Sequence, residues 1–126
     1  MKIVKLKDVP KQRLGEPLFT GNVTRQSPVT DNEGSDLSID YVHFPKGVRN
    51  KLHTHANDQV LIVTKGKGIV ASKDKVFFVE EGDIIWTPAE QAHYHGASEN
   101  SDFTHISVTH AHTKLTQIEK WYKEKV

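Results

Sequence analysis

Two histidines separated by a single residue, His53 and His55, are the side chains of this sequence best suited to bind a metal ion. Side chains two residues apart on an extended segment point to the same side, so both imidazoles face one space. Gln59 follows His55 in the same register, and its amide oxygen can point into that space. Imidazole nitrogen and amide oxygen both bind divalent transition metals. The segment 47–66 therefore carries half of a predicted metal site.

The composition limits the class of protein. A chain of 126 residues is expected to form one domain. Its 17 Lys+Arg and 16 Asp+Glu residues give a net charge of +1 without a basic stripe, so nucleic acid is not an expected partner. The absence of cysteine excludes disulfides and thiolate metal sites. No stretch approaches the roughly 20 apolar residues of a membrane span, and the first residues lack a signal-peptide apolar run, so we expect a cytoplasmic protein.

The elements that must position these histidines are short strands separated by Gly, Pro and polar turns, which is typical of an all-β sandwich or small barrel. Alternating or apolar runs predict strands at 2–6, 37–44, 60–63, 69–71, 76–79, 84–87 and 103–109. The residues 15–36 are expected to form a covering loop. We expect a hairpin turn at 72–75, and the sequence Gly66-Lys67-Gly68 predicts a tight reversal.

The end of the chain changes character. Thr116-Gln-Ile-Glu119 fits a helix capping box, and Ile118, Trp121 and Tyr122 fall on one face at helical spacing. A short C-terminal helix is therefore expected over about 116–125.

The run Val60-Leu61-Ile62-Val63 is apolar on both faces of its predicted strand. The outer face must then be covered as well, either by the N-terminal segment or by a second subunit. We expect a homodimer or homotetramer formed through sheet packing.

Two segments resemble the sequence motifs of the cupin family. Residues 47–66 match the first motif, G-x5-H-x-H-x3-E-x6-G, with Gln59 in place of the usual glutamate. Gly82, Pro88 and His93 match the second, G-x5-P-x-G-x2-H-x3-N, which here has Glu90 instead of glycine and Ala97 instead of asparagine. The resemblance covers about 37–110. It implies one cupin domain over 1–126, a double-stranded β-helix (jelly-roll barrel) preceded by a covering segment, 1–36.

Within the family, the chain is most similar to small manganese or iron cupins, a group that includes the bacterial hydroxynitrile lyases. The similarity lies in His53-Thr-His55-x3-Gln59, Gly82-Asp-Ile-Ile-Trp86, His93-x-His95-Gly96-Ala97 and Thr104-His105. It implies that the metal ligands are His53, His55, Gln59 and His93, and that His105 lines the pocket near the metal. Mn or Fe is the implied ion, with Ni, Co or Zn as alternatives.

The ligand set has a consequence for charge. Three neutral imidazoles and an amide leave the +2 charge of the ion uncompensated, so the ion is a stronger Lewis acid than it would be beside glutamate. It would attract an alkoxide, enolate or carboxylate.

Two further histidines are candidates for acid–base chemistry. His95 lies two residues after His93 and so points inward with it, while His105 can approach from a neighbouring strand. Either imidazole can exchange protons near neutral pH. The resemblance favours His105 as the catalytic residue, with His95 second.

These observations favour a metal-dependent enzyme that acts on a small oxygen-bearing molecule, most specifically a carbon–carbon lyase of the hydroxynitrile lyase type. A metal-dependent dioxygenase or other oxidoreductase is one alternative, and a non-catalytic cupin that binds a small ligand is another. A structural barrel without metal, in which Gln59 replaces a lost glutamate ligand, is the remaining one.

Overall fold

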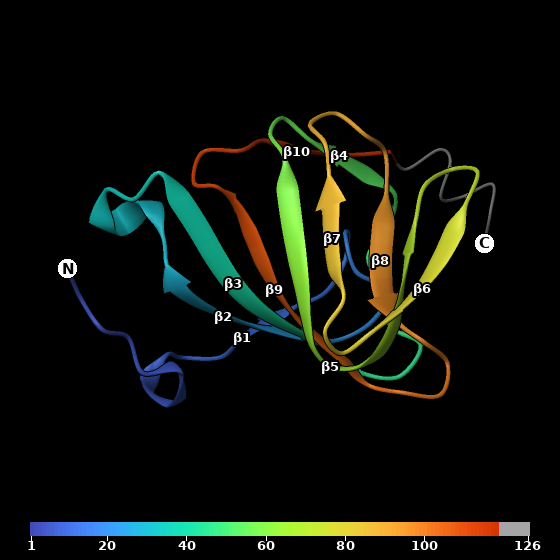
Figure 1. The fold of residues 1–126 in the computed structure, drawn as a ribbon, viewed down its shortest axis with the longest axis horizontal. Helices are drawn as coiled ribbons and strands as arrows, with labels where there is room; N and C mark the ends of the chain where they lie inside the picture. Colours follow the sequence, from blue (N-terminus) through green and yellow to red (C-terminus); the bar gives the residue numbers. More distant parts are fainter. Residues whose placement is uncertain (119–126) are drawn as a thin grey trace.

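The computed structural model describes residues 1–118 and is built almost entirely of β-strands (Figure 1). The strands are β1 (Gln12–Leu14), β2 (Val23–Val29), β3 (Leu37–Phe44), β4 (His53–His55), β5 (Gln59–Ala71), β6 (Val76–Glu80), β7 (Ile84–Thr87), β8 (Tyr94–Ala97), β9 (Phe103–His110) and β10 (Leu115–Gln117). Two 3-10 turns accompany them, η1 (Leu6–Asp8) and η2 (Asp31–Glu33). The expected all-β jelly-roll architecture is confirmed. None of the helical segments described is long and apolar enough to cross a membrane.

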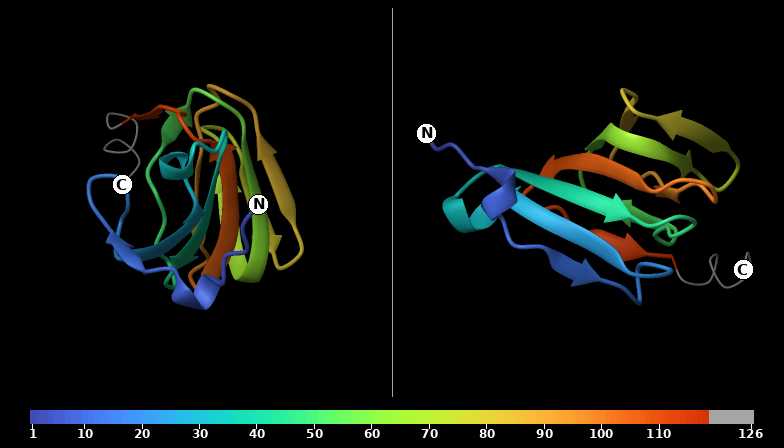
Figure 2. Two further views of the ribbon diagram at one scale, coloured as in Figure 1. Left: turned by 90° about the vertical axis from the view of Figure 1, so that its left-hand side faces the viewer. Right: turned by 90° about the horizontal axis from the view of Figure 1, so that it is seen from below.

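One antiparallel sheet runs in the order β1-β2-β3-β9-β5-β6, and the shorter strands β7 and β8 also pair with β5. Figure 2 shows the blue β1 and β2 at one edge and the yellow-green β5–β6 hairpin at the other. The first half of β5 pairs with β7 and β9, and its second half pairs with β6 and β8. This long strand therefore curves through the barrel and connects its two sides.

The predicted reversal at Gly66-Lys67-Gly68 is wrong, because these residues lie within the continuous strand β5. Gly66 has a φ of +79°, and the register between β5 and β9 shifts between Val63 and Lys65. A Cβ atom on Gly68 would lie 2.5 Å from the carbonyl oxygen of Gly96. The glycines thus bend the strand and allow a close approach of β8, instead of turning the chain back.

The N-terminal segment also differs from the prediction. Residues 2–5 form no strand, and the turn η1 begins at Leu6. The segment predicted as a loop contains β2, which pairs with β3. Its inward-facing positions include Arg25 beside the buried Val23, so the apolar alternation that reveals a strand is missing.

At the other end, β10 forms where the predicted helix was expected to begin. Thr116 pairs with Thr54 of β4, so a strand lies beside the two histidines of that segment. Residue 118 is not helical, and residues 119–125 of the predicted helix lie outside the described part of the chain.

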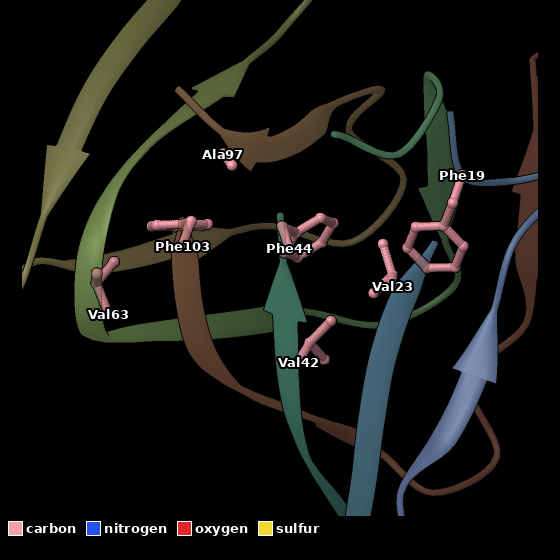
Figure 3. Packing of buried hydrophobic residues seen from close by; sticks show 7 residues of the cluster. All are labelled: Phe19, Val23, Val42, Phe44, Val63, Ala97 and Phe103. Carbon is pink, nitrogen blue, oxygen red and sulfur yellow. The ribbon is translucent and has the colours of Figure 1, made fainter. Parts of the chain in front are cut away.

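The apolar core fills one part of the barrel between the inner faces of the strands (Figure 3). Phe44 and Phe103 lie side by side, with ring centroids 6.1 Å apart, and Phe19 packs on the other side of Phe44 at 6.0 Å. The predicted alternation of β3 is confirmed, since Val42 and Phe44 are buried. Phe44 also contacts the ring of His105, at 5.4 Å between centroids, so the core supports the polar site next to it.

Candidate metal centre

The structure brings the four predicted ligands into one buried cluster. His53, His55 and His93 each offer one ring nitrogen that could bind a metal ion, and these nitrogens all lie within 4.8 Å of one another. The Nε2 atoms of His53 and His55 are 3.1 Å apart, and Nε2 of His93 lies 3.2 Å from Oε1 of Gln59. Two atoms that each bind one ion at about 2.1 Å are roughly 3.0–3.4 Å apart. The spacing of these donors therefore fits ligands that share a single cation.

Backbone pairing holds the two histidine segments together. His53 and His93 form an isolated antiparallel bridge, in which each backbone N–H donates to the other's carbonyl over 3.0 Å. The backbone N–H of Glu90 donates to the carbonyl of His55 over 2.8 Å. Gln59 is the first residue of β5 and follows a short turn after β4. The site is thus positioned by strand ends and by the loop after β7.

Hydrogen bonds orient three of the four donors toward the cluster. Nδ1–H of His53 donates to the carbonyl of Lys51 over 2.6 Å, and Nδ1–H of His93 donates to that of Gln91 over 2.8 Å. These partners assign the lone pair of each ring to Nε2. Nε2 of His93 lies 3.2 Å from Oε1 of Gln59, and two such acceptor atoms repel one another unless a cation lies between them. The donor set of the site therefore fits a bound divalent ion.

The amide of the fourth residue is oriented in a similar way. Nε2 of Gln59 donates to Oγ of Ser107 over 3.0 Å, which leaves Oε1 facing His93. His55 differs from the other three, because its Nδ1 is buried without a hydrogen-bond partner.

Burial keeps the cluster histidines neutral at physiological pH. Desolvation, followed by the neighbouring His93, lowers the pKa of His53 to about 3 and that of His55 to about 4. Desolvation also lowers the pKa of His93 itself. A neutral imidazole is the form that binds a metal, so no proton has to be displaced from these rings near pH 7.

The two predicted acid–base histidines lie beside this cluster. The His95 ring is stacked against that of His93 at 5.8 Å between centroids, and its Nδ1 lies 3.2 Å from Nε2 of His105. Both residues are fully buried. Desolvation, followed by the neighbouring His105, lowers the pKa of His95 well below its ordinary value, and desolvation lowers the pKa of His105 to about 3.

A cavity of about 130 Å³ adjoins the cluster. Its lining joins ring and amide groups of the site to apolar and charged side chains, namely Leu14, Leu18, Phe19, Arg25, Asp40, Val42, Phe44, Asn50, His53, His55, Gln59, His95, His105, Ser107 and Leu115.

Sequence reasoning missed four polar residues of this lining: Arg25, Asp40, Asn50 and Ser107. One signal was available, because Ser107 and His105 share a face of the strand predicted at 103–109. Asn50 had none, since it occupies an unspecified position of the first motif. Of the remaining histidines, His43 lies on the outer face of the sheet, where its Nδ1 contacts Oγ1 of Thr104 at 2.9 Å.

A jelly-roll barrel that gathers three histidines around an amide side chain from the first residue of its long strand is the architecture of a cupin. The family model for the cupin domain matches residues 40–109, which is more than half of the chain. The chain therefore belongs to the cupin family.

A curated relative comes from the bacterium Granulicella tundricola. It is an (R)-mandelonitrile lyase, and it is 35% identical to this chain over 68 residues. The match includes 53% of this chain and 52% of the relative, so it spans about half the length of each protein.

Two solved structures illustrate the shared fold. A cupin-like protein from Thermotoga maritima has a TM-score of 0.80 at 29% identity, with 89% of this chain and 90% of that chain covered. The polyketide cyclase RemF from Streptomyces resistomycificus has a TM-score of 0.85, with 99% and 92% covered. The identity to the cyclase is only 17%, so that likeness concerns the fold alone.

Proposed function

We propose that this protein is a metal-dependent carbon–carbon lyase of the hydroxynitrile lyase type, with His53, His55, Gln59 and His93 as its metal ligands. The observation that carries the proposal is the convergence of oriented donor atoms beside a buried histidine pair. The (R)-mandelonitrile lyase similar to part of this chain supports the same reaction class. A bound divalent ion would supply Lewis-acid polarisation of a substrate oxygen.

The ligand chemistry favours particular ions. Mixed nitrogen and oxygen ligation suits Mn or Fe, with Ni, Co or Zn as alternatives. Gln59 contributes no negative charge, so the site favours a substrate oxygen that is becoming anionic. We propose that the substrate is a small cyanohydrin, in keeping with the cavity of about 130 Å³.

Residues of the chain would transfer the proton and bind the apolar part of the substrate. Cleavage of a cyanohydrin removes the hydroxyl proton, converts the alcohol carbon to a carbonyl, and breaks the bond to the nitrile carbon. The electron pair of that bond leaves with cyanide, which then takes up a proton to give hydrogen cyanide. His105 is the group that holds and returns this proton, with His95 as the second candidate. Leu14, Leu18 and Leu115 line the cavity and can receive the apolar substituent of the substrate.

The direct test is cleavage of mandelonitrile by tag-free, manganese-loaded protein, followed as benzaldehyde formation. We expect activity in the wild type and its loss in His105→Ala, with one equivalent of metal in both proteins by elemental analysis. His43→Ala, on the outer face of the sheet, should retain wild-type activity. Failure of the manganese- and iron-loaded wild type to release benzaldehyde would rule out the proposed reaction.

We further propose that two copies of the chain pair through the outer face of the sheet. Strand pairing aligns eight apolar side chains there in two rows across β3, β9, β5 and β7. The rows are Tyr41, Ile106, Ile62 and Ile84, and Ile39, Val108, Val60 and Trp86. Ile84 and Trp86 remain 68% and 63% exposed in the single chain. A second copy would cover such a face.

A further inference from the structure

A buried asparagine is connected to the histidine pair by two hydrogen bonds. Oδ1 of Asn50 accepts from the backbone N–H of His95 over 2.8 Å, and its amide nitrogen Nδ2 lies 3.1 Å from Nε2 of the same residue. The backbone N–H of Asn50 donates to the carbonyl of His95 over 3.0 Å, which fixes the two residues relative to each other. A backbone N–H can only donate, so the amide cannot be turned around without losing this bond. Nδ2 is therefore the atom that faces the ring.

The polarity of that contact determines where the neutral rings carry their protons. An amide nitrogen donates, so Nε2 of His95 must accept, and the ring proton of His95 is placed on Nδ1. Nδ1 lies 3.2 Å from Nε2 of His105 and donates to it. His105 then keeps a lone pair on Nε2 and carries its own proton on Nδ1, which is buried without a hydrogen-bond partner.

We propose that Asn50 is a positioning residue that makes Nε2 of His105, and not a nitrogen of His95, the base of this site. The inference rests on the proposed function for the identity of the reaction, but the proton arrangement itself follows from the hydrogen bonds. For His95 to act as the base through Nδ1, its proton would have to move to Nε2. That proton would then point at the N–H group of Asn50, and two donors would face each other in a buried place.

In the reaction, the substrate hydroxyl would replace His95 as the donor to Nε2 of His105 and would pass its proton there. The same atom would return the proton to the departing cyanide. His95 stays neutral throughout and is held by Asn50.

The test reads the tautomers directly from ring 15N NMR of the full-length, zinc-loaded protein, because this ion is diamagnetic. In the wild type we expect the proton of His95 on Nδ1 and that of His105 on Nδ1. Asn50→Asp has the same shape but offers an acceptor, so the proton of His95 should move to Nε2. Asn50→Ala should give a mixture of both tautomers of His95. Asn100→Asp, at an exposed turn position, adds the same charge elsewhere and should leave both rings unchanged.

Activity provides a second and separate measurement. With metal content unchanged, kcat should fall at least tenfold in Asn50→Asp and Asn50→Ala. A wild-type His95 that carries its proton on Nε2, or an Asn50→Asp protein with unchanged tautomers, would overturn the inference. The expected tautomers in a protein without lyase activity would instead reject the proposed reaction and leave the role of Asn50 in place.

Discussion

Ser107 fixes the direction in which Gln59 points. Its Oγ accepts a hydrogen bond from Nε2 of Gln59 over 3.0 Å, and both side chains are buried. An amide has one ligating oxygen and a nitrogen that repels cations, so rotation by half a turn would replace a metal ligand with a donor. The orientation of the fourth proposed ligand therefore depends on a serine hydroxyl from β9.

Ser107→Ala is expected to weaken metal binding by about 10–100-fold, the usual effect of losing a group that orients a ligand. Competition with a chelator for Mn²⁺ measures the change. Ser38→Ala, a partly buried serine on β3 that no hydrogen bond connects to the site, is the matched control and should bind as the wild type does. Equal affinities for the Ser107 variant and the wild type would contradict the proposed ligand role of Gln59.

Glu90 occupies a backbone conformation that favours glycine. Its φ is +67°, and it is the only non-glycine residue among the described ones with a positive φ. An L-residue in the left-handed region costs roughly 1–2 kcal/mol. Glu90→Gly should therefore stabilise the protein by about 1 kcal/mol and preserve the N–H donation to the carbonyl of His55.

Thermal unfolding measures this effect as a rise in Tm. Glu81→Gly provides the comparison, because Glu81 is equally an exposed turn residue but has a negative φ. That variant should lose about 0.5–1 kcal/mol. A lower Tm for Glu90→Gly than for the wild type would show that the strain at this position is absent.

The buried His105 predicts how stability depends on pH in the metal-free protein. Its pKa is lowered by burial to about 3, against 6.5 in the unfolded chain. Between these values the unfolded chain binds a proton that the folded chain does not, so the free energy of unfolding decreases as the pH falls from 6.5 toward 3. Above pH 6.5 the stabilising contribution of the neutral His105 to the free energy of unfolding is fully present.

His105→Gln removes this titrating group and should make the decrease less steep, by up to about 1.4 kcal/mol per pH unit. Urea denaturation of metal-free wild type and variant at pH 7.5, 6 and 5 gives the two slopes. Parallel slopes would mean that the folded protein protonates His105 as readily as the unfolded chain does.

The sequence predicted that His53 and His55 lie on one side of their segment, because side chains two residues apart on a strand point the same way, and the structure places both in the buried cluster. It also predicted β3 and β9, whose inward positions alternate strictly. It could not predict β2, because the inward position of Arg25 lines a cavity instead of the core. Period-two hydrophobicity reveals a strand only where its inner face packs against apolar side chains.

The groups that orient the donors were less accessible to prediction. Asn50 contacts His95 across 45 residues of sequence, and Ser107 contacts Gln59 across 48. Such partners are set by the register between strands, which no local pattern specifies. The predicted reversal at Gly66 failed for a related reason, since glycine permits a turn and a bend equally, and the pairing of β5 on both sides of it decides between them.

The outer sheet face provides the last prediction. Ile84 is 68% exposed in the single chain and ends one of the two apolar rows proposed to pack against a second copy. Ile84→Lys would place a charge without a partner in that interface, at a cost of several kcal/mol, and should convert the dimer to a monomer. Phe78→Lys is the control, because Phe78 is 82% exposed on β6, outside both rows, and its replacement should leave a dimer. Sedimentation velocity distinguishes the two outcomes, and a monomeric wild type would contradict the proposed pairing.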